Sequence, residues 1–185
     1  ISDDEVAALP DLSSATVLPW KPDTVWFASN LQLGGSPFDA CSRTILSRVQ
    51  DQAAALGLRF NLGIETEFFA LRRGENGELM PASTGDTLAK PCYDLRGLLD
   101  NFAWLDELVQ AMNSLGWGVY SFDHEDGNGQ FETDFGYADG LVTADRVTFF
   151  RLMAREICRK HGLIASFMPK PFANRTGSGA HFNMS

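Results

Sequence analysis

The sequence contains few cysteines, and their spacing matches no common cysteine motif. Cys41, Cys92 and Cys158 lie far apart and form neither a CxxC pair nor a zinc-ligand spacing. A sparse, odd-numbered set is typical of buried thiols in a reducing compartment rather than of a disulfide framework. We therefore expect a cytoplasmic protein without a cysteine-based zinc site.

Basic charge and long apolar runs are also scarce. The chain carries 15 Lys and Arg against 24 Asp and Glu, a net charge of −9 at pH 7. Nucleic acid is therefore an unexpected partner, because phosphate backbones select basic surfaces. No apolar run approaches the ~20 residues that span a bilayer. The acidic first residues lack the positive region of a signal peptide, so no membrane association is expected.

The chain nevertheless has enough apolar residues to build a core. Its 185 residues are 44% hydrophobic and include 14 Phe and 4 Trp, which suits one compact domain or a domain with part of a second. The sequence opens without Met and stops inside the strand-like segment GAHFNMS. We expect it to be a piece of a longer protein.

Hydrophobic periodicity and turn signals predict an α+β fold, with helices packed outside a largely antiparallel sheet. Residues 1–22, which are rich in Pro and Ser, are expected to form an extended connector. Strands are predicted at 24–31, 60–73, 78–80, 117–122, 130–135, 163–167 and 180–185, and helices at 41–56, 95–115 and 141–161.

The most informative stretch is SFDHEDGNGQFETDF, residues 121–135. Two alternating runs flank a turn-forming core at 126–129, which predicts a hairpin. Because residues two apart share a face of a strand, Asp123 lies with Glu125, and Glu132 lies with Asp134. Four carboxylates on one hairpin indicate either a solvated face or a metal site.

Two other strands add ligand-type side chains. Glu65 and Glu67 share a face in the middle of the apolar 60–71 run, and His181 shares a face with Asn183. If these strands are neighbours, four carboxylates (Glu65, Glu67, Glu125, Glu132) and one imidazole face a common cavity. Oxygen donors with a single nitrogen suit Mg²⁺ or Mn²⁺. Two such ions would serve phosphoryl transfer or hydrolysis.

The residues give weaker evidence for nucleotide binding. No GxxxxGK[ST] loop occurs. The segment Thr176–Gly179 can either cradle an anion with its backbone or form an ordinary tight turn.

Together these motifs resemble the glutamine synthetase family. The segment Glu65–Phe69 is similar to its ExEFF strand, and His124–Glu132 to its HExxxGQxE metal-binding hairpin. The segments Phe167–Pro171 and Gly177–His181 are similar to its FxPKP and GSGxH signatures. Nearly all of the chain is covered. Residues 1–37 resemble the end of a β-grasp N-terminal domain, and 38–185 the first part of the catalytic domain.

The resemblance implies an ATP-dependent ligase that forms γ-glutamyl phosphate and passes the glutamyl group to ammonia or a small amine. It implies two Mg²⁺ or Mn²⁺ sites, ATP and glutamate as substrates, and a homo-oligomeric ring. By position, Glu67, Glu125 and Glu132 would hold one metal, and Glu65 and His181 the other. Tyr120, Asn183 and Ser185 would contact ATP, and Thr176 and Gly177 would contact glutamate. Asp123 and Asp134 match no motif and are expected to be supporting or solvated.

Departures from the family pattern leave the acceptor open. Thr176 stands where many members have Asn, and Asn183 where many have a second His. The segment Lys90–Asp94 looks closer to members that amidate glutamate with methylamine or other amines. A γ-glutamyl-polyamine or methylamine ligase and a catalytically silent binding protein are the alternatives. The resemblance also implies that further site residues lie outside these 185, so this piece alone is expected to be inactive.

Overall fold

A computed structural model of the protein describes residues 5–185, and it divides the chain into two compact units. The first unit takes in the chain up to Leu62, with Tyr137–Arg146 and Met184–Ser185. The second comprises Gly63–Gly136 and Val147–Asn183. Every strand pair with a defined register is antiparallel, and three long helices accompany the sheets, so the α+β prediction is confirmed.

The first unit begins with short strands rather than with a connector, so the prediction for residues 1–22 is wrong over its described part. Strands β1 (Val6–Pro10), β4 (Ser29–Leu33) and β5 (Ser36–Pro37) form one sheet, and β2 (Thr16–Leu18) pairs with β3 (Lys21–Trp26). The short helix η1 (Leu12–Ser14) links β1 to β2. The prolines had suggested a connector, but Pro10 ends a strand and Pro22 lies in a two-stranded ribbon, where proline is tolerated.

The single strand predicted at 24–31 is also wrong, because β3 and β4 are separate strands. Between them, the backbone N–H of Ala28 donates to Ser14 Oγ at 2.8 Å, and its carbonyl accepts from the N–H of Asp11 at 2.8 Å. These bonds tie buried Ala28 to the turn at η1 and interrupt the strand. Helix α1 (Ser42–Ala55) follows and confirms the helix predicted at 41–56.

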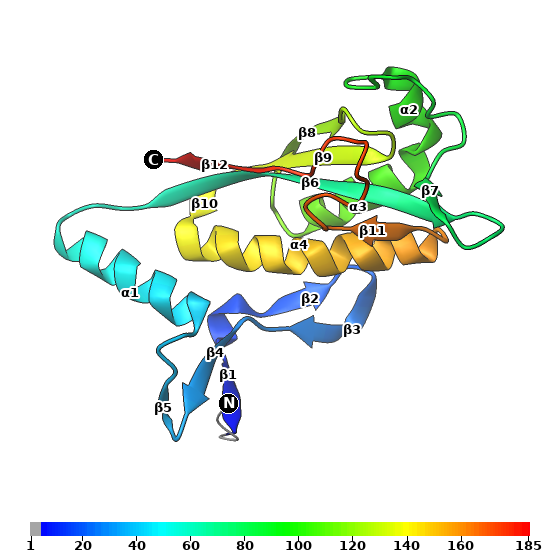
Figure 1. Ribbon diagram of the computed structural model, residues 1–185. Helices are drawn as coiled ribbons and strands as arrows, with labels where there is room; N and C mark the ends of the chain where they lie inside the picture. The colour runs from blue at the N-terminus through cyan, green and yellow to red at the C-terminus, as the bar shows by residue number, and fades with distance from the viewer. Residues whose placement is uncertain (1–4) are drawn as a thin grey trace. The chain divides into compact units, whose positions relative to one another are not determined.

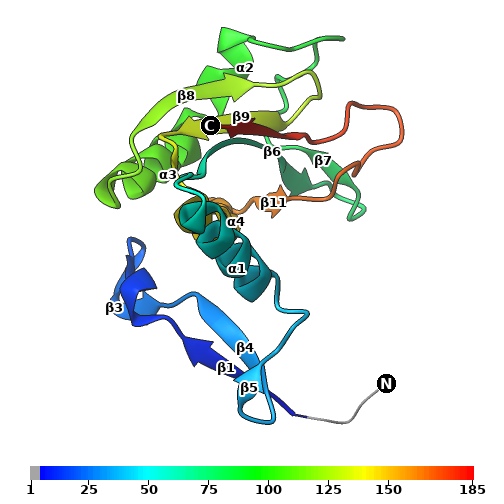
Figure 2. The ribbon, with the colours of Figure 1, turned by 90° about the vertical axis from the view of Figure 1, so that its left-hand side faces the viewer.

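The longest strand is β6 (Asn61–Arg73), and all of it from Gly63 onward belongs to the second unit (Figure 1). The order in its sheet is β10-β6-β9-β8, and β7, β11 and β12 also pair with β6. Figures 1 and 2 both show β12 running beside β6. The predicted strands and hairpin of this region are confirmed: β7 (Leu79–Pro81), β8 (Val119–His124), β9 (Gln130–Phe135), β11 (Ile164–Ser166) and β12 (Ala180–Met184); the short β10 (Ala138–Asp139) was not predicted.

The helix predicted at 95–115 is interrupted. Asn101, with φ −104° and ψ 2°, ends α2 (Leu95–Asp100) and begins α3 (Phe102–Ser114). Its side-chain N–H donates to the carbonyl of Gly97 at 2.8 Å, and its side-chain oxygen accepts from the indole N–H of Trp104 at 3.0 Å. A buried amide satisfied on both sides fixes this break. Helix α4 (Gly140–Lys160) confirms the prediction at 141–161.

The core of the second unit lies on one face of β6. Buried and half-buried residues alternate along the strand up to Phe68, with Ile64 and Thr66 buried. Fully buried Phe68 contacts aromatic rings from three other segments: Trp104 of α3, Phe150 of α4 and Phe167 after β11. Helices therefore cover this face, and Glu65 and Glu67 project from the other.

Two of the three thiols are buried, those of Cys41 and Cys158, whereas Cys92 is half-buried, and all three are free. No helix in the described part of the chain has the length and apolarity needed to cross a bilayer.

Candidate metal centre

Acidic side chains form two rows across three neighbouring strands of the second unit. In the first row, Glu67 of β6 lies opposite Glu132 of β9, which lies opposite Asp123 of β8. In the second row, Glu65 lies opposite Asp134. Opposite residues share a face of a sheet, so five carboxylates project from the same side.

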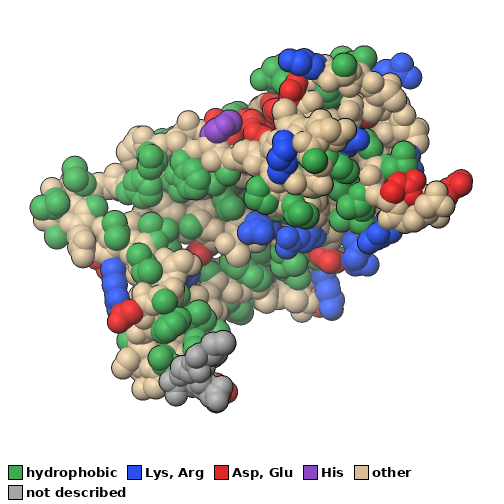
Figure 3. Space-filling model, in the orientation of Figure 1, with side chains coloured by type: hydrophobic (Ala, Val, Ile, Leu, Met, Phe, Trp, Pro, Cys, Tyr) green, Lys and Arg blue, Asp and Glu red, His purple; other side chains and the backbone are tan. Residues whose placement is uncertain are grey.

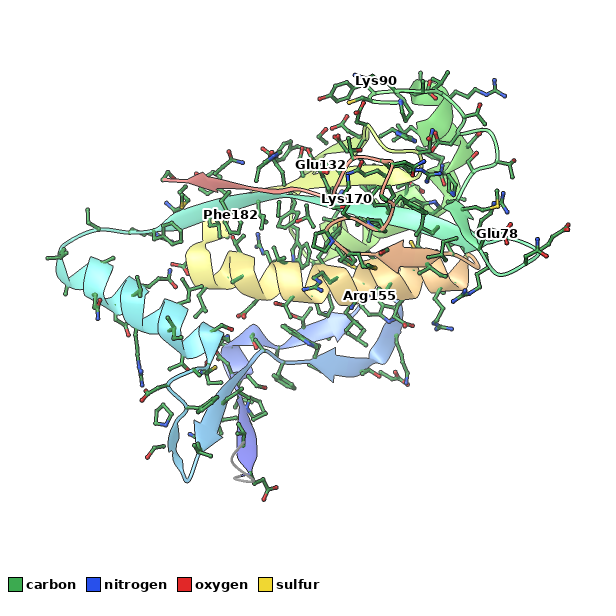
Figure 4. All side chains as sticks on the ribbon, viewed as in Figure 1. Glu78, Lys90, Glu132, Arg155, Lys170 and Phe182 are labelled. Atoms are coloured by element: carbon green, nitrogen blue, oxygen red, sulfur yellow. The ribbon has the colours of Figure 1, made fainter. Side chains whose placement is uncertain are left out.

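Strand β12 adds two nitrogen-bearing side chains, His181 and Asn183, beside Glu65 of the second row. His181 Nδ1 lies 2.9 Å from Glu65 Oε2, and Asn183 Nδ2 donates to Glu65 Oε1 at 2.9 Å. One ligand atom each from Glu65, Glu132 and His181 lie within 4.8 Å of one another. Figure 3 shows acidic side chains gathered beside a histidine on this surface, and Figure 4 labels Glu132 on β9.

Burial and mutual repulsion make three carboxyl groups of the hairpin, those of Glu125, Glu132 and Asp134, hard to ionise. Burial, followed by the charges of Asp134 and Glu125, raises the pKa of Glu132 to about 7. Burial and the charge of Glu65 raise the pKa of Asp134 to about 6, and burial with the charge of Glu67 raises that of Glu125. Within the described residues, Asp134 Oδ1 is buried without a hydrogen-bond partner. Such a cluster fits a divalent cation, which supplies the missing positive charge.

The ligand atoms that lie closest together in the structure are not the set that the family pattern assigns to one metal. Glu132 comes together with Glu65 and His181, whereas the pattern placed it with Glu67 and Glu125. Neither Glu67 nor Glu125 belongs to that group of close ligand atoms among the described residues, although the charges of both raise the pKa of Glu132. The division of the five residues between two metals stays a prediction.

Asp123 and Asp134, which match no family motif, lie on the acidic face. The charges of both raise the pKa of neighbouring carboxyl groups, after the effect of burial. Ser121 Oγ donates to Asp123 Oδ2 at 2.5 Å, and Asp134 is 9% exposed. The alternation of the hairpin already placed both on this face, and that signal was sufficient to find them.

The predicted glutamate-binding loop packs against the same face. Thr176 Oγ1 donates to Gln130 Oε1 at 2.8 Å, and the carbonyl of Gly177 accepts from Gln130 Nε2 at 2.9 Å. Glu67 N donates to the carbonyl of Gly179 at 3.3 Å. The loop and the acidic rows therefore form one continuous surface in the second unit.

The three residues predicted to contact ATP lie in different settings. The Tyr120 side chain is 71% exposed, and partial burial together with the charges of Asp134 and Glu65 raises its pKa. Asn183 is bonded to Glu65. Ser185 is exposed and exchanges backbone hydrogen bonds with Asn61, at 2.9 and 3.2 Å. Their contact with a nucleotide stays a prediction.

Sequence reasoning missed the buried pair that holds the turn of the hairpin. His124 Nε2 lies 2.9 Å from Asp86 Oδ2, and both side chains are almost fully buried. Burial opposes charge on both groups, yet their hydrogen bond raises the pKa of His124 and lowers that of Asp86. Asp86 also accepts from the N–H of Gly129 at 2.6 Å and from Asn128 Nδ2 at 2.8 Å. Its carboxylate thereby anchors the turn between Glu125 and Glu132.

An α+β domain whose antiparallel sheet presents a cluster of metal-ligand-type side chains is the class that this fold and site define. Residues 39–185 match the family model described as the glutamine synthetase catalytic domain, and the chain belongs to this family. It is 43% identical over 183 residues to a glutamate–methylamine ligase of Methyloversatilis universalis, covering 99% of this chain and 41% of that protein. It is 41% identical over 181 residues to a glutamine synthetase of Rhizobium meliloti, covering 98% and 41%.

Solved structures give the same result for the fold. The solved structure of a GmaS/ADP complex superimposes with a TM-score of 0.91 at 42% identity, covering 100% of this chain and 43% of that one. A glutamine synthetase of Plasmodium falciparum has a TM-score of 0.80 at 20% identity, covering 100% and 42%, which shows the shared fold alone. The chain thus spans about two fifths of the length of these relatives.

Proposed function

We propose that the protein containing this chain is an ATP-dependent ligase that joins glutamate to ammonia or a small amine through γ-glutamyl phosphate. The observation that carries the proposal is the acidic face of the β6, β8 and β9 strands, completed by His181, in a chain of the glutamine synthetase family. The names of the relatives support both ammonia and methylamine as acceptors.

The side chains would hold two divalent cations, Mg²⁺ or Mn²⁺. We assign Glu67, Glu125 and Glu132 to one site and Glu65 and His181 to the other. When bound, the cations neutralise charge on the phosphate oxygens of ATP. Because the pKa of Glu132 is raised to about 7 and that of Glu125 is also raised, cation binding to these carboxylates would release protons.

Contacts with the two larger substrates complete the proposal. Tyr120, Asn183 and Ser185 would face ATP, and Thr176 with Gly177 would orient glutamate. The Thr176 hydroxyl is held by Gln130, so its position is fixed before substrate arrives. We also propose that the intact protein is cytoplasmic and assembles as a homo-oligomeric ring, which the measured mass of the full-length protein will test.

Methylamine is the second candidate acceptor. The superposition on the GmaS structure, with a TM-score of 0.91, and the 43% identity to the methylamine ligase favour it. The identity to the Rhizobium glutamine synthetase is only two points lower, so the acceptor needs a direct assay.

The test is phosphate release by the full-length protein with ATP, glutamate, Mg²⁺ and one amine at a time. Ammonia, methylamine, ethylamine and putrescine form the panel. The proposal predicts glutamate-dependent release with ammonia or methylamine, and loss of that release in Glu132→Ala. Release that is independent of glutamate, or no release with any amine from a folded protein that binds Mn²⁺, would contradict it.

A further inference from the structure

Gln130, the first residue of β9, is 1% exposed and has every polar group of its side chain bonded. Its Nε2 donates to Glu67 Oε2 at 2.7 Å and to the carbonyl of Gly177 at 2.9 Å. Its Oε1 accepts from the N–H of Gly127 at 3.0 Å and from Thr176 Oγ1 at 2.8 Å. An amide with two donors and two filled acceptor positions has a single favourable orientation at this site.

The four contacts reach three separate segments. Glu67 belongs to β6, Gly127 to the hairpin turn, and Thr176 and Gly177 to the loop before β12. Each bond is buried or partly buried, and leaving one of its partners unpaired would be costly. A shift of the loop at Thr176 and Gly177 would therefore move the Gln130 side chain and, through it, the Glu67 carboxylate.

The other oxygen of Glu67 faces the same loop. A Cβ atom added at Gly179 would lie 2.7 Å from Glu67 Oε1, so this carboxylate approaches the loop backbone closely. The N–H of Glu67 also donates to the Gly179 carbonyl at 3.3 Å. One oxygen of Glu67 is therefore bonded by Gln130, and the other lies against the backbone of the 176–179 loop.

We propose that Gln130 is a positioning residue that couples the loop at Thr176 and Gly177 to the metal-facing carboxylate of Glu67. This inference rests on the proposed function, because it takes Glu67 as a metal ligand and the loop as a glutamate contact. Coupling is reciprocal, so glutamate strengthens metal binding by the same factor as metal strengthens glutamate binding. Gln130 carries part of that factor.

The experiment measures Mn²⁺ affinity of the full-length protein with and without glutamate, for the wild type and three variants. Gln130→Met removes all four contacts at similar volume. Gln130→Glu can keep both acceptor contacts but removes both donors, so it tests the bonds to Glu67 and to the Gly177 carbonyl apart from the other two. Asn101→Leu is the control, because Asn101 is also a buried amide of the same unit, and its side-chain bonds in the described part of the chain are to Gly97 and Trp104.

We expect both Gln130 variants to weaken Mn²⁺ binding and to reduce the glutamate–metal coupling factor by about fivefold or more. Asn101→Leu lowers the melting temperature but leaves the coupling factor unchanged. An unchanged coupling factor in folded Gln130 variants would overturn the proposal. Equal loss of coupling in the Asn101→Leu control would also overturn it, since the effect would then be a general one of stability.

A second measurement separates this inference from the proposed function. Amide hydrogen exchange of residues 168–180 is followed in metal-free protein. We expect faster exchange in Gln130→Met and in Gln130→Glu than in the wild type or the control. No change in exchange would contradict the structural link, whatever the metal data show. Wild-type protein that binds no Mn²⁺ yet shows the expected exchange would contradict the proposed function instead.

Discussion

Glu67 of β6 lies directly opposite Glu132 of β9, and the next pair on the same face, Glu65 and Asp134, is also acidic. Like charges directly opposite one another destabilise a sheet. Repulsion within these two successive pairs therefore lowers the stability of the sheet when no cation is bound. Metal binding and folding are therefore expected to be linked.

Removing one carboxylate from the rows should separate stability from metal binding. We expect Glu132→Gln to stabilise the metal-free protein by about 0.5–1 kcal/mol, because it removes one member of a like-charge pair. The same change weakens Mn²⁺ binding by about tenfold or more. Chemical denaturation and metal titration measure the two effects. Glu75→Gln, at an exposed loop position, is the control and should change neither. Destabilisation by Glu132→Gln without metal would contradict this account.

The stability of the metal-free protein should depend on pH in the direction set by Glu132 and Asp134. Their pKa values are raised to about 7 and about 6, so between pH 4 and 7 the folded state binds more protons than the unfolded state. Stability therefore falls as pH rises through this window. Thermal unfolding in EDTA at several pH values measures the slope. Saturating Mn²⁺ should remove or reverse the fall, and a metal-free stability that rises across the window would refute the assignment.

Asp86→Asn should loosen the turn that carries the metal-binding hairpin. The variant amide loses the charged bond to His124 and can present an N–H to the N–H of Gly129. Breaking a buried pair of this kind costs about 2–3 kcal/mol. Urea denaturation measures the loss. Asp100→Asn provides the comparison, because within residues 5–185 that exposed carboxylate accepts a side-chain bond only from Ser83 Oγ, and its substitution should cost less than about 0.5 kcal/mol. Equal effects of the two changes would contradict a special role for Asp86.

Substitution of Arg43 should strongly lower the unfolding free energy of the first unit. Its guanidinium bonds to Asp145 at 3.0 Å, to Asp11 at 2.7 Å and to Asn30 at 3.0 Å, and its side chain is 13% exposed. We expect Arg43→Met to cost about 2–3 kcal/mol in unfolding free energy, because it leaves two carboxylates unpaired.

The matched control for that change is Arg48→Met on the same helix. Arg48 pairs with Asp39 at 2.8 Å, but the two side chains are 50% and 87% exposed. Exposed pairs of this kind contribute less than about 1 kcal/mol. Thermal or urea unfolding of both variants compares the two sites. If Arg43→Met lowers the unfolding free energy no more than Arg48→Met does, the Arg43 network does not contribute more to stability than an exposed ion pair.

Local patterns predicted the parts of the fold that depend on local interactions. Alternation placed Glu65 with Glu67 and Glu132 with Asp134, because the face of a strand is set by parity alone. The break at Asn101 was missed even though it is local, since apolar spacing continues across it and does not report the side-chain bonds of Asn101 to Gly97 and Trp104. The domain boundary between residues 37 and 38 stays a prediction.

The unpredicted features depend on contacts between distant segments. Asp86 lies in a polar loop without a motif, and its bond to His124 joins residues 38 positions apart. Gln130 shares the strand parity of Glu132, but its bonds to residues 46 and 47 positions away could not be deduced from that parity. The strands before residue 22 were not predicted, because proline at the end or edge of a strand cannot be distinguished in the sequence from proline in a connector.

The most direct test of the central claim is the number of Mn²⁺ ions bound by the full-length protein, measured by electron paramagnetic resonance titration with the Glu132→Ala variant alongside. The account predicts two ions per chain in the wild type, and a variant that stays folded but binds fewer ions or binds them at least about tenfold more weakly. Wild-type protein that binds no Mn²⁺, or a variant with unchanged stoichiometry and affinity, would contradict it.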